Sequence, residues 1–315
     1  MIPTLDDIRQ AQKRIAGAAI RTPLVRLNVA EAPAEIYLKL ENLQPIGSFK
    51  IRGAANAMAQ LPPERLRQGV FTASAGNMAQ GVAWQARALG IPCTIIAPET
   101  IPETKSKAIE QLGGRVIKVS FERWWQTFQE RSYPDLEGAF IHAFDDPNVM
   151  AGNGVIMLEI LEDLPEVDTV ITPWGGGGLS CGIAAAARAL KPACRIYAAE
   201  VATGAPLAAS LAAGSPQQVD YQPSFVDGIG SKTVFPQMLA QAQALLNGAL
   251  VAELAEVAAA VRLLAERNRV IAEGAGACPV ACALSGQAGS GKIVCVISGG
   301  NIDLKKLASL FAAEA

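Results

Sequence analysis

Lys50 lies in the segment of this chain whose residue types most clearly indicate a catalytic role. A glycine and an aromatic residue precede it in the run Gly47-Ser48-Phe49-Lys50. A lysine held in such a turn can lose its charge and act as an amine nucleophile, as a Schiff base to an aldehyde cofactor requires. Taken alone, the run also fits a solvated surface lysine, the commoner fate of this residue type.

A run of four glycines supplies a second feature that a cofactor would need. Gly175, Gly176, Gly177 and Gly178 follow a predicted strand at residues 170–172, and Leu179 begins a predicted helix. Glycines let backbone N–H groups approach an anion, and the helix dipole adds attraction. Four successive glycines are costly in entropy, so a phosphate cradle is favoured over a flexible loop.

Two further polar loops follow predicted strands. Ser74-Ala75-Gly76-Asn77 comes after residues 70–73, and Ser298-Gly299-Gly300-Asn301 comes after residues 293–297. In open parallel sheets, ligands bind at the carboxyl ends of the strands, where helices begin. We therefore expect these loops, the glycine run and Lys50 to line one site.

Strand and helix patterns alternate along most of the chain, which favours an α/β fold of open twisted parallel sheets with helices on both faces. Residues 78–89 have a helical pattern that Gly90 should end, and residues 139–144 are apolar and predicted to be extended. The order of the elements predicts two domains. A large cofactor-binding domain takes residues 1–67 and 146–315, and a small domain with the substrate loop takes residues 68–145.

Composition argues against several kinds of partner. The net charge of −2 gives no electrostatic case for nucleic acid or an anionic membrane surface. The two long uncharged stretches, 169–187 and 274–291, contain proline and several glycines, which argues against membrane spans. The six cysteines have no Cys-x-x-Cys spacing and the N-terminus has no secretory pattern, so we expect reduced cysteines and a cytoplasmic protein.

Two other patterns are set aside because of their context. Residues 286–292 have P-loop spacing, but Ile293 stands where Ser or Thr would bind magnesium, and the run precedes its strand instead of following one. His142 is the one histidine of the chain, which excludes a site with several histidine ligands. Its apolar neighbours predict a structural role.

The motifs together resemble those of the fold-type II pyridoxal-phosphate enzymes, and most of all the threonine/serine dehydratase and serine racemase branch. The resemblance covers nearly the whole chain, keeps the order of the motifs, and rests on residues 41–50, 74–81, 175–178 and 298–301. It implies pyridoxal 5′-phosphate as the cofactor, an amino acid as the substrate, and a homodimer.

The resemblance also implies how the cofactor is held. Lys50 would form the Schiff base and later remove the Cα proton, and Phe49 would pack on the pyridine ring. Asn77 would hydrogen-bond the 3′-oxygen, and Ser298 would meet the pyridine nitrogen. The backbone N–H groups of the glycine run and Leu179 would bind the phosphate.

The reaction predicted from this arrangement is β-elimination. A serine hydroxyl cannot stabilise a protonated pyridine as a carboxylate would, so prompt loss of a β-leaving group is favoured over a long-lived carbanion. Dehydration of a β-hydroxy-α-amino acid such as threonine or serine, followed by release of a 2-oxo acid and ammonia, fits this demand.

The substrate carboxylate would be bound by the loop that Ser74 begins, and Ser74 would also be a catalytic residue. The loop residues are Ser74, Ala75, Gly76, Asn77 and Met78. Racemases of this branch carry a second acid/base hydroxyl at the position of Ala75, so an amino-acid racemase is kept only as an alternative. Ala75 and Met78 also make the loop less polar, which leaves a dehydratase for a bulkier aryl substrate, such as phenylserine, as another.

Two properties of relatives are not expected. Glu200 aligns with the first ligand of the branch's divalent-cation site, but Pro206 stands where a carboxylate would complete it, so we predict no metal. One predicted helix follows the Ser298 loop, which leaves no room for the regulatory domain of biosynthetic threonine deaminases. Feedback by isoleucine is therefore not expected.

Overall fold

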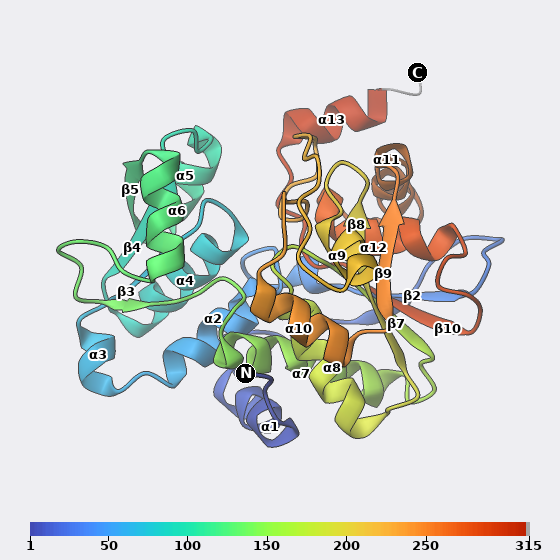
Figure 1. The fold of residues 1–315 in the computed structure, drawn as a ribbon, viewed down its shortest axis with the longest axis horizontal. Coiled ribbons are helices and arrows are strands. Elements are labelled where there is room, and N and C mark those ends of the chain that lie inside the picture. The colour runs from blue at the N-terminus through green and yellow to red at the C-terminus, as the bar shows by residue number, and fades with distance from the viewer. Residues whose placement is uncertain (313–315) are drawn as a thin grey trace.

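The largest element of the protein is a six-stranded sheet, on the right of Figure 1, in a computed structural model that describes residues 1–312. All neighbouring strands are parallel except β1 and β2. In spatial order they are β1 (Leu24–Arg26), β2 (Glu35–Lys39), β10 (Lys292–Val296), β7 (Thr169–Pro173), β8 (Arg195–Val201) and β9 (Gly248–Ala252). The pairing of β2 with β10 brings the two ends of the sequence together.

Helices cover both faces of this sheet because its central strands are apolar on both sides. In β10, Val294 and Val296 pack into one hydrophobic cluster, whereas Ile293 and Cys295 pack into the other. The first cluster includes α1 (Leu5–Arg14), α7 (Pro147–Asp163), α8 (Gly178–Leu190), α9 (Pro206–Ala213) and α10 (Pro236–Leu245). The second includes α11 (Leu254–Leu263), α12 (Gly274–Leu284) and α13 (Leu304–Ala312).

A smaller sheet of four parallel strands lies on the left of Figure 1. Its order is β5 (Arg115–Val119), β4 (Cys93–Pro98), β3 (Val70–Ala73) and β6 (Ala139–Phe140). One face is covered by α4 (Asn77–Leu89) and α5 (Glu103–Gln111), the other by α6 (Phe121–Glu130), and α3 (Pro63–Arg67) precedes β3. The predicted α/β class with parallel sheets and helices on both faces is confirmed.

Helix α2 (Lys50–Ala59) lies between the two sheets (Figure 1). Ala55 packs into the core of the large sheet, whereas Ala54, Ala57 and Met58 pack into the core of the small one. Lys50 is the first residue of this shared helix. The helix therefore places Lys50 at the junction of the two halves.

Most of the predicted elements are present, with shifts of one residue at several of their ends and one larger difference. The helix at residues 78–89 begins one residue earlier, at Asn77, and ends at Gly90, which adopts the left-handed conformation with φ 66°. The extended segment expected at residues 139–144 is a strand only at Ala139–Phe140. The chain turns after it because Nδ1 of His142 accepts hydrogen bonds from the N–H groups of Phe144 and Asp145.

None of the described helices combines the length and the apolar character needed to cross a membrane.

Candidate active site

The turn that carries Lys50 is tied directly to the Ser298 loop. The N–H of Phe49 donates to the carbonyl of Ser298 at 2.9 Å, and the N–H of Gly300 donates to the carbonyl of Gly47 at 2.9 Å. Gly47 has φ 70°, and a Cβ there would lie 2.6 Å from Oδ1 of Asn301. The turn needs glycine both for its left-handed backbone and for this close approach. Two segments about 250 residues apart thus form one surface.

The amine of Lys50 lies in an apolar and weakly compensated place. Its Nζ donates to the carbonyl of Ala143 at 2.8 Å and lies 5.1 Å from the centre of the Phe49 ring. Burial lowers the pKa of Lys50 to about 8, although the nearby Glu273 acts in the opposite direction. The side chain is therefore far closer to an uncharged amine at neutral pH than an ordinary lysine is.

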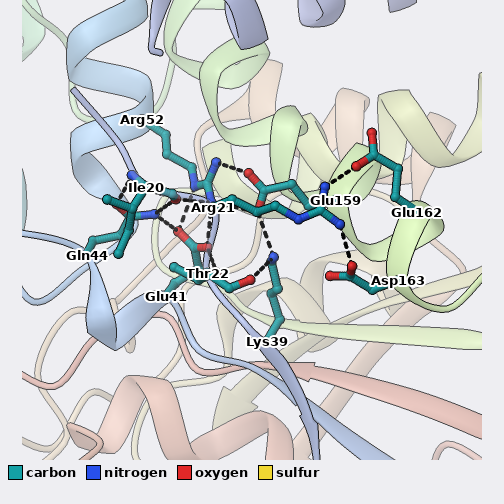
Figure 2. Close-up of polar contacts among 10 residues, drawn as sticks. All are labelled: Ile20, Arg21, Thr22, Lys39, Glu41, Gln44, Arg52, Glu159, Glu162 and Asp163. Atoms are coloured by element: carbon teal, nitrogen blue, oxygen red, sulfur yellow. Dashed lines mark hydrogen bonds and ion pairs between the residues drawn. The ribbon is translucent and has the colours of Figure 1, made fainter. Parts of the chain in front are cut away.

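Arg52 fixes α2 two residues after Lys50 (Figure 2). Its guanidinium binds Glu41 through Nε and Nη2, both at 2.8 Å, and Glu159 through Nη1 and Nη2, at 2.7 and 2.9 Å. Arg52 is 1% exposed. Glu41 belongs to the 3₁₀ turn η1 (Glu41–Leu43) and Glu159 to α7, so one side chain joins three elements.

The second buried cation of this network is Lys39, at the end of β2. Its Nζ pairs with Glu159 at 2.6 Å and donates to the carbonyl of Thr22 at 2.6 Å. The hydroxyl of Thr22 donates to Glu41 at 2.6 Å. Two cations thus face two anions in a network that is almost fully buried, and every charge in it has an opposite partner (Figure 2).

The glycine run is closely packed, not flexible. A Cβ on Gly176 would lie 2.0 Å from the ring of Phe144, and one on Gly178 would lie 2.7 Å from the carbonyl of Phe144. Gly177 has φ 91° and directly precedes α8. Phe144 follows Ala143, the partner of Lys50, so the cradle and the amine are joined by one short segment. Side chains are excluded here, which leaves backbone N–H groups to meet an anion.

The Ser74 loop also reaches this place, through Asn77 at the start of α4. The amide oxygen of Asn77 accepts a hydrogen bond from Asn301 at 2.8 Å, and its Nδ2 donates to Glu273 at 2.8 Å. The hydroxyl of Ser74 accepts from the N–H of Gly76 at 3.3 Å.

The remaining loop residues differ in their surroundings. A Cβ on Gly76 would meet nothing within 4 Å, so this part of the loop is open. Ala75 is partly exposed, whereas Met78 is 2% exposed and packs into the core of the small sheet. The side chain of Met78 is therefore taken up by packing. Leu179, in the first turn of α8, is 4% exposed, so its contribution to an anion site is its backbone N–H.

Glu273 was not identified from the sequence. It is 6% exposed, its N–H donates to the carbonyl of Gly299 at 3.0 Å, and it directly precedes α12. Burial raises its pKa to about 7. The signal in the sequence was an acidic residue before a helix that begins with Gly274-Ala275-Gly276, a pattern that hydrophobic periodicity alone does not reveal.

These features match what pyridoxal phosphate requires. An amine of lowered pKa, an anion cradle that side chains would fill, and the 2% exposed Ser298, two residues after β10, lie on connected segments. The parallel sheets and this site together define a pyridoxal-phosphate enzyme of fold type II.

Comparison with known proteins gives the same assignment. Residues 15–299 match the family described as pyridoxal-phosphate dependent enzyme, and the chain belongs to this family. It is 39% identical over 312 residues to an L-threonine ammonia-lyase of Thermotoga maritima, covering 96% of this chain and 77% of that one. It is 41% identical over 310 residues to an L-threonine ammonia-lyase of Geobacter sulfurreducens, covering 95% and 76%. The structure of maize serine racemase superposes with a TM-score of 0.89 at 33% identity, covering 100% and 98%.

Glu200, considered above for a cation site, has backbone partners instead. Its carboxylate oxygens accept hydrogen bonds from the N–H groups of Leu207 and Ala208, at 2.9 and 2.8 Å, at the start of α9. No cluster of three or more His, Cys, Asp or Glu side chains suited to a metal is found within residues 1–312. That Glu200 binds no cation stays a prediction.

Proposed function

We propose that this chain removes water and then ammonia from threonine or serine and releases a 2-oxo acid. The observation that carries the proposal is the meeting of Lys50, the glycine cradle and Ser298 on connected segments, with a lysine pKa of about 8. The reaction class, pyridoxal-phosphate-dependent β-elimination from hydroxy amino acids, is that of an ammonia-lyase. Two relatives more than a third identical to this chain bear the name L-threonine ammonia-lyase.

In this proposal the residues of the chain hold the reactants and move one proton. When bound, pyridoxal phosphate supplies an electron sink for the Cα of the amino acid. Lys50 anchors the cofactor and takes the Cα proton, Asn77 orients the 3′-oxygen, and Ser298 meets the pyridine nitrogen without adding a charge. Phe49 packs beside the ring, and Ser74 with the open backbone at Gly76 receives the substrate carboxylate.

Ala75 distinguishes the lyase from an amino-acid racemase. A racemase needs an acid/base group on each face of Cα, and an alanine methyl can neither give nor take a proton. The similarity to maize serine racemase is the observation that keeps this alternative in view. Because Met78 packs into the core, only Ala75 among the two apolar loop residues bears on an aryl substrate such as phenylserine.

The domain division, assembly and location are also proposals. We assign residues 68–145 to a small domain that carries the substrate loop, because the small sheet lies within this range. The cytoplasm is proposed because all six cysteines are unpaired and buried. A homodimer, the usual assembly of the family, is tested by light scattering of the purified protein.

The deciding experiment is a substrate panel assayed in parallel for 2-oxo acid, ammonia and D-amino acid. We expect 2-oxo acid and ammonia in equal amounts from L-threonine or L-serine, and little D-serine. The same panel with Ala75→Ser should show a gain in D-serine formation if Ala75 suppresses racemisation. Turnover of phenylserine alone would replace the proposed substrate, and D-serine formed faster than 2-oxo acid by the wild-type protein would contradict the lyase.

A further inference from the structure

Glu273 is a buried carboxylate at the candidate active site that the mechanism above does not use. Its carboxylate accepts a hydrogen bond from Nδ2 of Asn77, and no ion pair of this side chain is found in the described part of the chain. Glu273 differs in this respect from the buried Glu41 and Glu159, which both form ion pairs with Arg52. A buried carboxylate without an ion-pair partner needs another reason to be there.

The surrounding backbone leaves room for this carboxylate. A Cβ on Gly299 would lie 2.5 Å from Oε1 of Glu273 and 3.2 Å from Nδ2 of Asn77. A Cβ on Gly276 would lie 2.6 Å from the carbonyl of Gly299. Glycine at both positions lets α12 approach the Ser298 loop, and the contact between Glu273 and Asn77 depends on this approach.

Asn77 is held at both ends of its amide. Nδ2 of Asn301 donates to the amide oxygen of Asn77 and also to the carbonyl of Ile46, each at 2.8 Å. The oxygen of Asn77 is thereby fixed as an acceptor, and its Nδ2 must face Glu273. One N–H of that Nδ2 is used by Glu273, which leaves the second N–H to serve the cofactor.

The charged groups around Glu273 come from three other segments. Lys50 on α2 and Lys105 on α5 favour its ionised form, whereas Asp227 in the loop before α10 opposes it. Asp227 is itself shared between Lys105 and Lys306 of α13, with both Nζ–Oδ2 distances at 3.3 Å. These charges oppose one another, so burial remains the largest influence and raises the pKa of Glu273 to about 7.

We propose that Glu273 is a positioning residue whose proton sets, through Asn77, the charge that the 3′-oxygen of the cofactor can carry. When Glu273 is neutral, it accepts the hydrogen bond from Asn77 and adds no charge, so the 3′-oxygen on the other side of Asn77 can be negative. An ionised Glu273 adds a like charge to the same poorly solvated edge, which favours a protonated 3′-oxygen. The proposal deepens the proposed function, since it rests on the assignment of Asn77 to the 3′-oxygen, but it does not depend on which amino acid is the substrate.

The experiment is a pH titration of the absorbance spectrum of the substrate-free holoenzyme. The ratio of the two bands that report the protonation of the 3′-oxygen should change with a midpoint near the pKa of Glu273, about 7. In Glu273→Gln the hydrogen bond from Asn77 can persist without a titrating charge, so the ratio should stay constant through this range at its low-pH value. An unchanged titration in Glu273→Gln would overturn the proposal.

Glu200→Gln is the matched control. Glu200 is also buried, and its pKa is also raised to about 7, but its partners are at the start of α9. The wild-type spectral titration should persist in Glu200→Gln, and its loss there would show that any buried carboxylate has the effect, which would contradict the role of Glu273. Asn77→Ala should abolish the titration, and its persistence would overturn the coupling through Asn77.

The apoenzyme provides a test that needs no cofactor. A carboxylate whose pKa is raised on folding stabilises the folded state below its unfolded pKa of about 4.5, and this contribution is lost as the pH rises through about 7. Glu273→Gln should therefore raise the melting temperature more at pH ~8 than at pH ~5, relative to wild type. An equal shift at both values would contradict a titrating Glu273. The two proposals can therefore fail separately. If Glu273→Gln gives this pH-dependent shift but Lys50→Ala retains the absorbance band of the bound cofactor, the proposed function is wrong while the titration of Glu273 stands.

Discussion

Lys50 and Arg52 are two residues apart on α2 and meet opposite electrostatic environments. Arg52 is enclosed by Glu41 and Glu159, which raise its pKa above the ordinary value despite burial. Lys50 has a backbone carbonyl as its hydrogen-bond partner, and burial lowers its pKa to about 8. One helix therefore carries a cation that must keep its charge and a cation that gives it up readily.

The difference separates a buried cation that holds neighbouring elements in place from one whose charge is easily lost. A buried pair with several hydrogen bonds holds its partners in one geometry, because moving either one exposes an uncompensated charge. A buried group without an opposite charge has a shifted pKa, and such shifts gather at functional sites. The network around Arg52 fixes α2, and this holds Lys50 at a defined position without an ion-pair partner of its own.

The largest expected effect comes from removing the amine of Lys50. Lys50→Ala should lower turnover by about 10²–10⁴-fold or more, because Lys50 is the proposed general base and also the proposed anchor of the cofactor. Steady-state kinetics and the visible absorbance of the protein measure both losses. The fold should be intact by circular dichroism, because the Arg52 network is untouched.

Lys107→Ala is the control for this change. Lys107 is on α5 with its side chain 64% exposed, and its pair with Glu103 is at the surface. Its removal should leave turnover and absorbance at the wild-type level. Activity retained in Lys50→Ala would exclude Lys50 as the base.

Removing the anchoring cation should act on stability. Arg52→Met leaves Glu41 and Glu159 buried without this partner, which should lower the free energy of unfolding by about 3–5 kcal/mol. Urea unfolding of the apoenzyme measures the loss. The double variant that adds Glu41→Gln should recover part of it, because Glu41 is then neutral while Glu159 keeps its ion pair with Lys39.

An ion pair at the surface provides a comparison for the loss of stability predicted in Arg52→Met. Arg21 pairs with Glu162 and Asp163, and the side chains of Arg21 and Glu162 are about half exposed (Figure 2). Glu162→Gln should change the free energy of unfolding by no more than about 1 kcal/mol. Equal losses in Arg52→Met and Glu162→Gln would remove the contrast between the network and the surface.

The last prediction concerns the pH dependence of the stability of the apoenzyme. The pKa of Lys50 falls on folding from about 10.5 to about 8, so the wild-type protein loses stability as the pH falls through that range. Lys50→Met has no such charge, and its stability relative to wild type should grow between pH ~10 and ~7 by up to about 3 kcal/mol. Thermal unfolding at several pH values measures this difference, and a constant difference would mean that Lys50 titrates normally.

Much of the candidate site could be predicted because it consists of local patterns. Asn77, the glycine run and Ser298 are each next to a glycine or follow an apolar strand, and Lys50 comes three residues after Gly47, so each of these signals lies within a few residues of sequence. The helix at residues 78–89 was predictable for the same reason, since Gly90 ends it. The strand expected at residues 139–144 was wrong beyond Phe140 because a side chain, His142, turns the backbone.

The amino-acid sequence by itself determined the class of chemistry, the order of the loops and the α/β pattern, all of which depend on residue type and spacing. It could not show that Arg52 bridges Glu41 and Glu159, that Met78 packs into the core, or that Glu273 meets Asn77. Those partners are 11 to 196 residues apart. Their contacts arise only when β2 pairs with β10 and α2 packs between the two sheets, and burial in that packing is what shifts the pKa values of Lys50 and Glu273.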